Sequence, residues 1–306
     1  MSIKRNSTTL VDLGVYKLEV TVRGPPRRAH NPIAIIIPDI GSSIKEWTAV
    51  TEMLANSMAV VRYERAGYGQ SENVVPGGSR APAALAMELH MLLRAAKIAP
   101  PYIMVCHSRG ASILREFTKL RNLAQFKGFV FVDVKTGSLD QSVQAKLSGL
   151  DSLKLCYGDC HRLGESAWQA LLDEEARAGH QVAAEREIAE YHIGGENSAV
   201  MDPSGVEQPE YGLVPLVVLQ ADVSVDTRKI CCEEDRAENG TEAEGNDMRD
   251  AVERLTELEV TKLKNLLKLS TRSQYEYVTG VGERIHLTVP ERVGNAVTWI
   301  LMQYRC

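Results

Sequence analysis

Residues 105–111 constrain this chain of 306 residues more than any other segment. The apolar run at residues 101–105 favours a strand, and the pattern of residues 112–117 favours a helix. Between them stands Ser108, in the order Cys-His-Ser-Arg-Gly. A serine on so short a strand-to-helix turn is typical of a nucleophile elbow, which lifts the hydroxyl above a sheet beside a helix N-terminus. The segment therefore predicts a sheet covered by helices.

The rest of the chain repeats this alternation. Apolar runs typical of buried strands occur at residues 32–37, 59–63, 129–132 and 215–219, and helical patterns lie between many of them. This order is typical of an α/β fold, in which a mostly parallel central sheet carries helices on both faces. We also expect a helix over residues 42–55 and a solvated loop over the acidic residues 233–247.

The domain organisation follows from one gap in this pattern. No apolar strand run occurs between residues 135 and 209. We therefore predict that residues 1–134 and 212–306 form the core and that residues 135–211 form an inserted helical lid.

Composition excludes several classes of function. The net charge is −5 and no basic stripe occurs, which argues against a nucleic-acid partner or an anionic membrane surface. No apolar run approaches the roughly 20 residues that a membrane span needs. The polar N-terminus shows no secretory signal, so we expect a cytoplasmic protein with a small-molecule substrate. The oligomeric state stays open, with a homodimer among the options.

The cysteines do not predict a metal site. Cys156, Cys160 and His161 have ligand chemistry, but no second ligand pair follows at the spacing of a zinc finger. We therefore expect reduced thiols, no metal and no cofactor.

Four segments carry a resemblance to a known family. They are residues 40–47, 62–72, 101–117 and 279–291, and together they resemble the α/β-hydrolase superfamily, in particular its capped fungal-type members. Their order and spacing match over nearly the whole chain, so the resemblance implies the α/β-hydrolase fold. It also implies the positions of a serine, a histidine, an acidic residue and two N–H groups for an oxyanion.

Two of these positions are filled as the resemblance implies. Ser108 stands at the nucleophile position, and the backbone N–H groups of Ile40 and Arg109 stand where the oxyanion donors would be. The histidine position is different, because it holds Glu283, and His286 follows three residues later. The catalytic triad implied by the resemblance is therefore degenerate.

The position of the acidic residue is also altered. Ser224 occupies it, with Asp222 and Asp226 on either side and Asp133 at the end of an earlier strand as alternatives. With no histidine to orient, an acidic residue at this position loses its usual purpose.

Asp39 changes the oxyanion loop. It stands directly before Ile40, where relatives carry glycine. Two unit charges about 4 Å apart repel by roughly 4 kcal/mol at an effective dielectric of about 20. That repulsion offsets most of the stabilisation by one oxyanion donor, which is roughly 3–4 kcal/mol. Three alternatives stay open: Asp39 is protonated, it pairs with Arg109, or it points away.

A serine without a basic partner is a poor nucleophile, so ester or amide hydrolysis by the usual route is not expected. We predict an enzyme of the lyase, cyclase or isomerase type, with Glu283 or Asp39 as the acid/base group and Ser108 as a positioning or hydrogen-bonding group. The resemblance implies a small, largely apolar organic substrate from secondary metabolism.

Further residues are expected to contact that substrate, and two other functions stay open. Beside Ile40 and Arg109, the expected contacts are His286, Trp168 and Asp222. The first alternative function is a serine hydrolase with an unusual triad that uses His286 or His192 of the lid. The second is a ligand-binding protein without catalysis.

Overall fold

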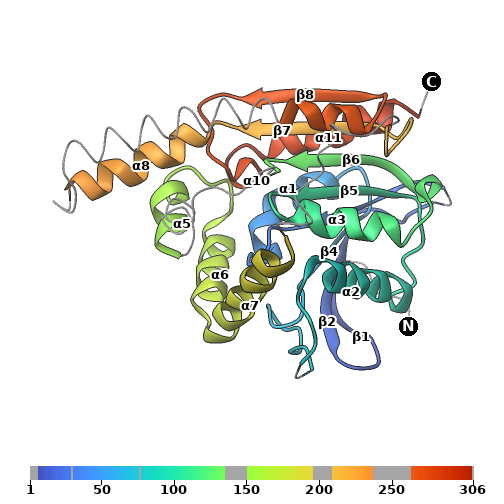
Figure 1. Cartoon of the computed structure of the whole chain (residues 1–306), viewed down its shortest axis with the longest axis horizontal. Helices are drawn as coiled ribbons and strands as arrows, with labels where there is room; N and C mark the ends of the chain where they lie inside the picture. Colours follow the sequence, from blue (N-terminus) through green and yellow to red (C-terminus); the bar gives the residue numbers. More distant parts are fainter. Residues whose placement is uncertain are drawn as a thin grey trace.

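A single sheet organises the computed structural model, which describes residues 6–28, 30–75, 77–134, 150–195, 209–236 and 263–304. Within these residues, eight strands pair in the order β1-β2-β4-β3-β5-β6-β7-β8 (Figure 1). β2 runs antiparallel to both of its neighbours, and the pairs from β4 to β8 are parallel. The strands are β1 (Ser7–Asp12), β2 (Lys17–Arg23), β3 (Ile33–Ile37), β4 (Val60–Tyr63), β5 (Tyr102–His107), β6 (Phe126–Val132), β7 (Leu216–Ala221) and β8 (Ser273–Val278). The prediction of a mostly parallel sheet is confirmed.

Helices cover both faces of this sheet. α1 (Thr48–Ala55) packs with α11 (Pro290–Met302) on one face, and α2 (Pro82–Ala95) packs with α3 (Gly110–Lys119) on the other. The other α-helices of the described residues are α5 (Leu150–Tyr157), α6 (Glu165–Ala176), α7 (Ala178–Gly195), α8 (Val223–Arg236) and α10 (Ile285–Thr288). Short 3-10 helices are η1 (Ile44–Trp47), η2 (Leu123–Gln125) and η4 (Leu266–Leu269). None of the helices in the described part of the chain is long and apolar enough to cross a membrane.

The alternation of side chains along β3 explains the two layers. Ile33, Ile35 and Ile37 belong to the hydrophobic core under α2 and α3, whereas Ala34 and Ile36 belong to the core under α1 and α11. Successive side chains of a strand point to opposite faces, so an uninterrupted apolar run fits only a strand that is buried on both faces.

Three sequence predictions need correction. The helix expected over residues 42–55 begins as the 3-10 turn η1, because the Ser43 hydroxyl accepts the N–H of Lys45 and starts a tighter turn before α1. The loop expected over residues 233–247 is helical as far as Arg236, since α8 extends through its first four residues. The strand β1 was not foreseen, because its alternating side chains are mostly polar.

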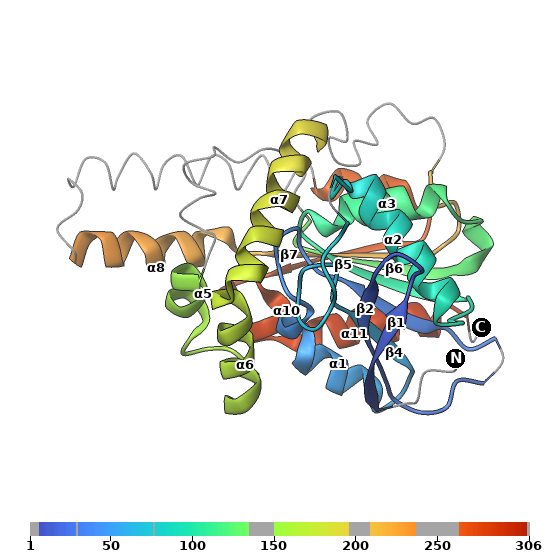
Figure 2. The same cartoon turned by 90° about the horizontal axis from the view of Figure 1, so that it is seen from below.

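The segment between β6 and β7 contains α5, α6 and α7. These helices lie beyond the carboxyl ends of the parallel strands (Figures 1 and 2). The lid boundaries at residues 135 and 211 stay a prediction, because residues 135–149 and 196–208 lie outside the described part.

Candidate active site

The turn between β5 and α3 places Ser108 at a nucleophile elbow. Ser108 has a φ of 50°, in the left-handed region that residues with a side chain rarely adopt. Gly110 permits the close approach of α3 to the loop after β3, because a Cβ there would lie 2.4 Å from the backbone oxygen of Pro38. The Ser108 side chain is buried. Within the described residues, no hydrogen bond links its hydroxyl to a base.

The Asp39 carboxylate accepts hydrogen bonds from both backbone N–H groups that were expected to bind an oxyanion. Oδ1 of Asp39 accepts the N–H of Ile40 at 2.7 Å and the N–H of Arg109 at 3.0 Å. The Arg109 guanidinium adds two contacts, with Nε 3.1 Å from Oδ1 and Nη2 3.1 Å from Oδ2. We call these four donors the cradle of Asp39. Of the three alternatives for Asp39, the structure shows the pairing with Arg109.

Asp39 is held in its ionised form. Burial alone would raise the pKa of its carboxyl, but the Arg109 guanidinium and its hydrogen bonds hold that pKa below the ordinary value. For Arg109, burial would lower the pKa, but the Asp39 carboxylate raises it, and Tyr191 and Glu283 contribute in the same direction. The charges of Asp39, Arg109 and Glu283 therefore act on one another beside the elbow.

Glu283 stands after β8 and is held in place by Asp226. Its N–H donates to Oδ2 of Asp226 at 2.8 Å, and the Tyr157 hydroxyl donates to the same oxygen at 2.5 Å. Burial and the nearby Glu283 carboxylate raise the pKa of Asp226. Gly282 makes this contact possible, because a Cβ there would lie 2.1 Å from Oδ1 of Asp226. Sequence reasoning missed Tyr157 and left Asp226 among several alternatives.

The other acidic candidates have local roles. Oδ1 of Asp222 accepts the N–H of Ser224 at 3.2 Å and its hydroxyl at 2.6 Å, so Asp222 supports the first turn of α8. Asp133 accepts the N–H of Ala221 at 3.2 Å. Because α8 begins directly after β7, its first turn carries Asp226 toward Glu283. Asp222 therefore supports the start of this helix, and its predicted contact with a substrate stays a prediction.

His286 lies in the core and not at the surface of the site. Its side chain is 0% exposed and stacks on Trp47, with 4.2 Å between the ring centroids and 2° between the ring planes. Its Nε2 lies 3.0 Å from Oε2 of Glu46. The predicted contact of His286 with a substrate stays a prediction, and in this structure packing buries the whole ring.

Trp168 is also a packing residue. It is 7% exposed, stacks on His161 at 4.1 Å between ring centroids and joins the small core that α5 and α6 form with Ile230 and Leu287. Its predicted contact with a substrate likewise stays a prediction. The side chain of His192 lies outside the described part of the chain.

A buried carboxylate ties the inserted helix α7 to the oxyanion loop. Glu187 is 0% exposed and pairs with Arg65 at 2.8 Å and with Arg80 at 2.7 Å. It also accepts the Tyr68 hydroxyl at 2.9 Å and the N–H of Gly41 at 3.2 Å. Gly41 is two residues from Asp39, so α7 and the cradle of Asp39 are joined through one short loop.

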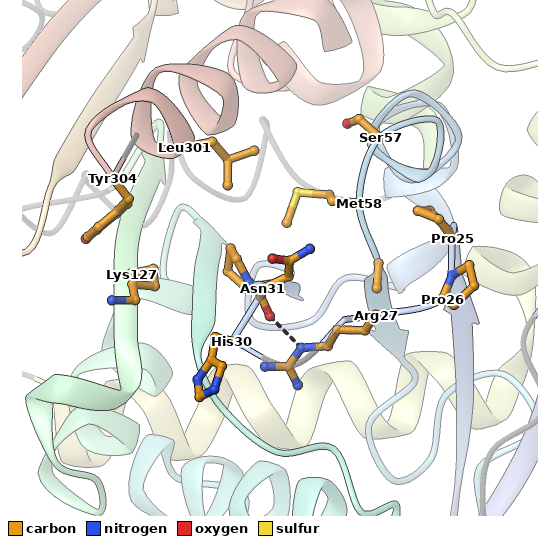
Figure 3. Close-up of a pocket in the computed structure, with 12 residues that line it drawn as sticks. Pro25, Pro26, Arg27, His30, Asn31, Ser57, Met58, Lys127, Leu301 and Tyr304 are labelled. Carbon is orange, nitrogen blue, oxygen red and sulfur yellow. Dashed lines mark hydrogen bonds between the residues drawn. The ribbon is translucent and has the colours of Figure 1, made fainter. Parts of the chain in front are cut away.

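A separate cavity of about 300 Å³ lies at the amino ends of the strands (Figure 3). Arg27, His30, Lys127 and Tyr304 are among its lining residues. The Arg27 guanidinium donates to the backbone oxygen of Asn31, so it holds the loop together. Ligands of open α/β sheets bind at the carboxyl ends of the strands, so the elbow is the candidate active site.

Comparison with known proteins identifies the class to which this geometry belongs. No family model matches the chain. A protein of Gibberella zeae named AB hydrolase superfamily protein is 27% identical over 307 residues, covering 94% of this chain and 92% of that protein. A protein of Hormonema carpetanum named Probable transporter efuK is 25% identical over 307 residues. That match covers 96% of this chain and 43% of the relative, so the chain spans less than half of that relative's length.

Solved structures share the fold at lower identity. A serine hydrolase involved in carbazole degradation, the CarC enzyme, is 15% identical with a TM-score of 0.64, covering 97% of this chain and 99% of its own. An AqdC variant, described for recognition and ring-cleavage of the Pseudomonas quinolone signal, is 12% identical with a TM-score of 0.60. The match covers 97% of this chain and 99% of that chain. The resemblance to the α/β-hydrolase superfamily is confirmed, and this chain is an α/β-hydrolase-fold protein. Its similarity to the Gibberella zeae protein extends over nearly the full length of both chains.

Proposed function

We propose that this chain is a non-hydrolytic enzyme of the lyase, cyclase or isomerase type that acts on a small, largely apolar organic substrate. The observation that carries the proposal is the Asp39 carboxylate in the cradle of the Ile40 and Arg109 N–H groups. A tetrahedral intermediate of hydrolysis needs these donors for its own negative oxygen. In this chain they already bind a carboxylate.

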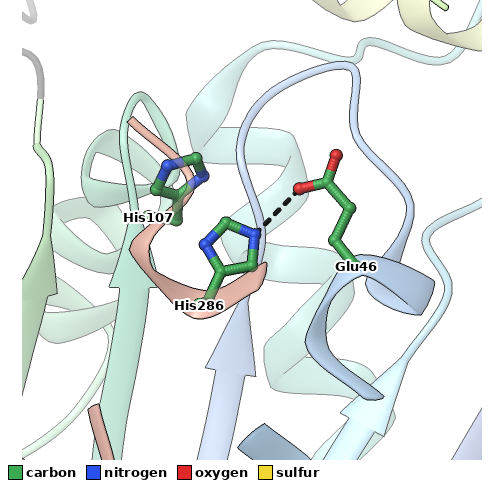
Figure 4. A group of neighbouring side chains, drawn as sticks. All are labelled: Glu46, His107 and His286. Atoms are coloured by element: carbon green, nitrogen blue, oxygen red, sulfur yellow. Dashed lines mark hydrogen bonds and ion pairs between the residues drawn. The ribbon is translucent and has the colours of Figure 1, made fainter. Parts of the chain in front are cut away.

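The absence of a base for Ser108 supports the same proposal. Ser108 needs a partner that takes its proton before it can attack a carbonyl carbon. Glu283 replaces the histidine that the family places after β8, and no hydrogen bond joins the His286 ring, which lies beside Glu46 (Figure 4), to the Ser108 hydroxyl within the described residues. Within the described residues, the Ser108 hydroxyl therefore has no hydrogen-bonded proton acceptor, and the two oxyanion donors already bind Asp39.

Carboxylates near the elbow support a role in proton transfer. Glu283 stands beside Asp226, whose pKa is raised, and near Arg109, which keeps Asp39 ionised. Acidic groups whose pKa values are pushed apart suit the roles of general acid and general base. We assign Glu283 the proton transfer, and Ser108 a hydrogen bond to the substrate.

The fold itself does not choose between these chemistries. Hydrolysis and ring cleavage both occur among proteins with the same architecture. The substrate is therefore proposed from the site and from the family resemblance, which favours secondary metabolism.

Labelled water tests the proposal. The purified chain is incubated with a metabolite extract of its source organism in water enriched in the heavy oxygen isotope, and new products are sought by mass spectrometry. We expect a product without the heavy isotope, lost in Glu283→Gln and reduced in Ser108→Ala. A matched control is Glu185→Gln, which changes an exposed glutamate of α7.

Two results would overturn the proposal. Heavy oxygen in the product, together with labelling of Ser108 by a fluorophosphonate probe, would indicate a serine hydrolase. Retention of an unchanged ligand by wild type, with no product, would indicate a binding protein.

A further inference from the structure

The cavity at the amino ends of the strands lies at the opposite edge of the sheet from the elbow that carries Ser108. Its lining residues are far apart in the sequence and fall within residues 25–32, 57–59 and 301–304, together with Lys127 of β6 (Figure 3). Its volume of about 300 Å³ is at the lower limit of the range that is typical of small-molecule sites. The cavity therefore has room for a small organic molecule.

Backbone contacts hold the loop after β2 that forms one wall of this cavity. Gly24 has a φ of 97°, and a Cβ there would lie 2.2 Å from the backbone oxygen of Met58. The Arg27 guanidinium donates to three backbone oxygens, which belong to Asn31, Ala99 and Pro101. These bonds use three of its five N–H groups and leave two without a partner within the described residues. Arg27 therefore fixes the loop and still has donors for an anion.

The charged side chains of the lining are all basic. Arg27, His30 and Lys127 line the cavity, and among the described residues no aspartate or glutamate does. Within the same part of the chain, no carboxylate forms an ion pair with any of these three side chains. Burial lowers the pKa of Arg27, and no described carboxylate counteracts this effect. Although the chain as a whole has a net charge of −5, this cavity has an excess of positive charge and attracts anions.

The cavity also has an apolar side. Figure 3 shows Met58 and Leu301 across the cavity from the three basic side chains. An inorganic anion would contact the basic side and leave the apolar side without a partner. An anion with an apolar body contacts both sides, and removal of its apolar surface from water adds to its affinity.

We propose that this cavity binds a small organic acid. The carboxylate of the ligand lies on the side of Arg27, His30 and Lys127, and its apolar body packs against Met58 and Leu301. A few polar groups that fix the orientation of a ligand beside apolar walls are typical of small-molecule sites. Because the cavity and the elbow lie at opposite edges of the sheet, this site is separate from the candidate active site and does not depend on the reaction at Ser108.

Ligand titration of the full chain tests this site independently of any substrate. The probe is 2-naphthoate, which joins one carboxylate to a flat apolar body, and its binding is measured by calorimetry at low ionic strength. We expect one naphthoate per chain with a dissociation constant below about 1 mM. The uncharged 2-naphthamide should bind at least about 10-fold more weakly, because hydrogen bonds to a charged group are stronger than those to a neutral one. Inorganic phosphate should also bind at least about 10-fold more weakly, because it has no apolar body.

Variants locate the bound naphthoate. Lys127→Met removes an ammonium group and keeps a long side chain, whereas Asn31→Asp adds a carboxylate to the lining without a change of shape. Each should weaken naphthoate binding by about 10-fold or more, by loss of an attractive charge or by gain of a repulsive one. Lys154→Met is the matched control, because it makes the same charge change on the exposed side of α5 and should bind as wild type does. Circular dichroism confirms the fold of each variant.

Four results would overturn the proposal. The first is a folded wild type that does not bind naphthoate, or binds it with a dissociation constant above about 1 mM. The second is equal affinity for naphthamide, which would indicate an apolar cavity without recognition of an anion. The third is equal affinity for phosphate, which would indicate a site for inorganic anions. The fourth is undiminished binding in Lys127→Met and Asn31→Asp, or loss of binding in Lys154→Met, which would place the naphthoate elsewhere on the chain.

Discussion

Replacing Asp39 by asparagine tests the cradle at the elbow directly. The carboxylate accepts four hydrogen bonds, from the N–H of Ile40 and from the N–H, Nε and Nη2 of Arg109. In Asp39→Asn the shape stays, but the charge is lost and an NH₂ group faces the guanidinium. Breaking a buried ion pair by removing one partner costs about 3–5 kcal/mol. The two side chains are 13% and 11% exposed, so we expect the lower part of that range, about 3 kcal/mol.

The assay is thermal and urea unfolding at neutral pH. For a chain of 306 residues, an unfolding entropy of about 2.1 cal/mol/K per residue converts about 3 kcal/mol into a melting-temperature decrease of about 5 °C. Asp159→Asn changes an exposed aspartate and is the control, with an expected change within about 0.5 kcal/mol. A double-mutant cycle with Arg109→Met then measures the coupling between the two side chains.

The pH dependence gives a second check on the same pair. The pKa of Asp39 is lower in the folded state than in the unfolded state, so its contribution is complete above the unfolded value of about 3.9. It is lost as the pH falls through the folded value. The deficit of Asp39→Asn should therefore be full at pH 7 and shrink below about pH 4. Equal stability of variant and wild type at pH 7, or additive effects with Arg109→Met, would refute the pairing.

Three further predictions concern other parts of the site. Burial alone would lower the pKa of His180, but the carboxylates of Glu174 and Glu175, 3.3 and 3.1 Å from its two ring nitrogens, raise it to about 9. His180→Gln should therefore be destabilised below about pH 6.5 and match wild type in urea unfolding once the pH exceeds about 9. Glu187→Gln leaves two buried arginines without their anionic partner and should lower the free energy of unfolding by about 3–5 kcal/mol. The control Glu185→Gln changes an exposed glutamate and should leave that free energy unchanged. Equal urea midpoints for the two variants would contradict the network around α7. Gly110→Ala places a Cβ 2.4 Å from a backbone oxygen and should lower the melting temperature. The control Gly164→Ala adds a Cβ in open space and should leave the melting temperature unchanged. An unchanged melting temperature in Gly110→Ala would show that the elbow is looser than described.

Local patterns in the sequence were sufficient for the sheet and for the elbow. The run in β3 alternates between the two cores, and such a run can be buried only in a strand that is covered on both faces. The order of residues around Ser108 likewise requires a strand, a short turn and a helix. These features depend on neighbours within a few positions, so they can be predicted without tertiary contacts.

The partners of the charged residues could not be predicted in this way. The sequence left three alternatives for Asp39, and the choice depended on Arg109, which lies 70 residues further along the chain. Asp226 meets Glu283 across 57 residues, because α8 begins directly after β7 and turns its first acidic residue toward the end of β8. The helix pattern alone gave no reason to prefer Asp226 over Asp222.

The sequence by itself therefore determined the architecture and the place of Ser108, and the tertiary structure decided what surrounds Ser108. Hydrophobic periodicity acts over short distances along the chain and specifies strands and helices. Ion pairs and hydrogen bonds depend on which loops meet at the carboxyl ends of the strands. Packing places Glu46, His107 and His286 in the interior and leaves the Asp39 carboxylate to occupy the oxyanion donors.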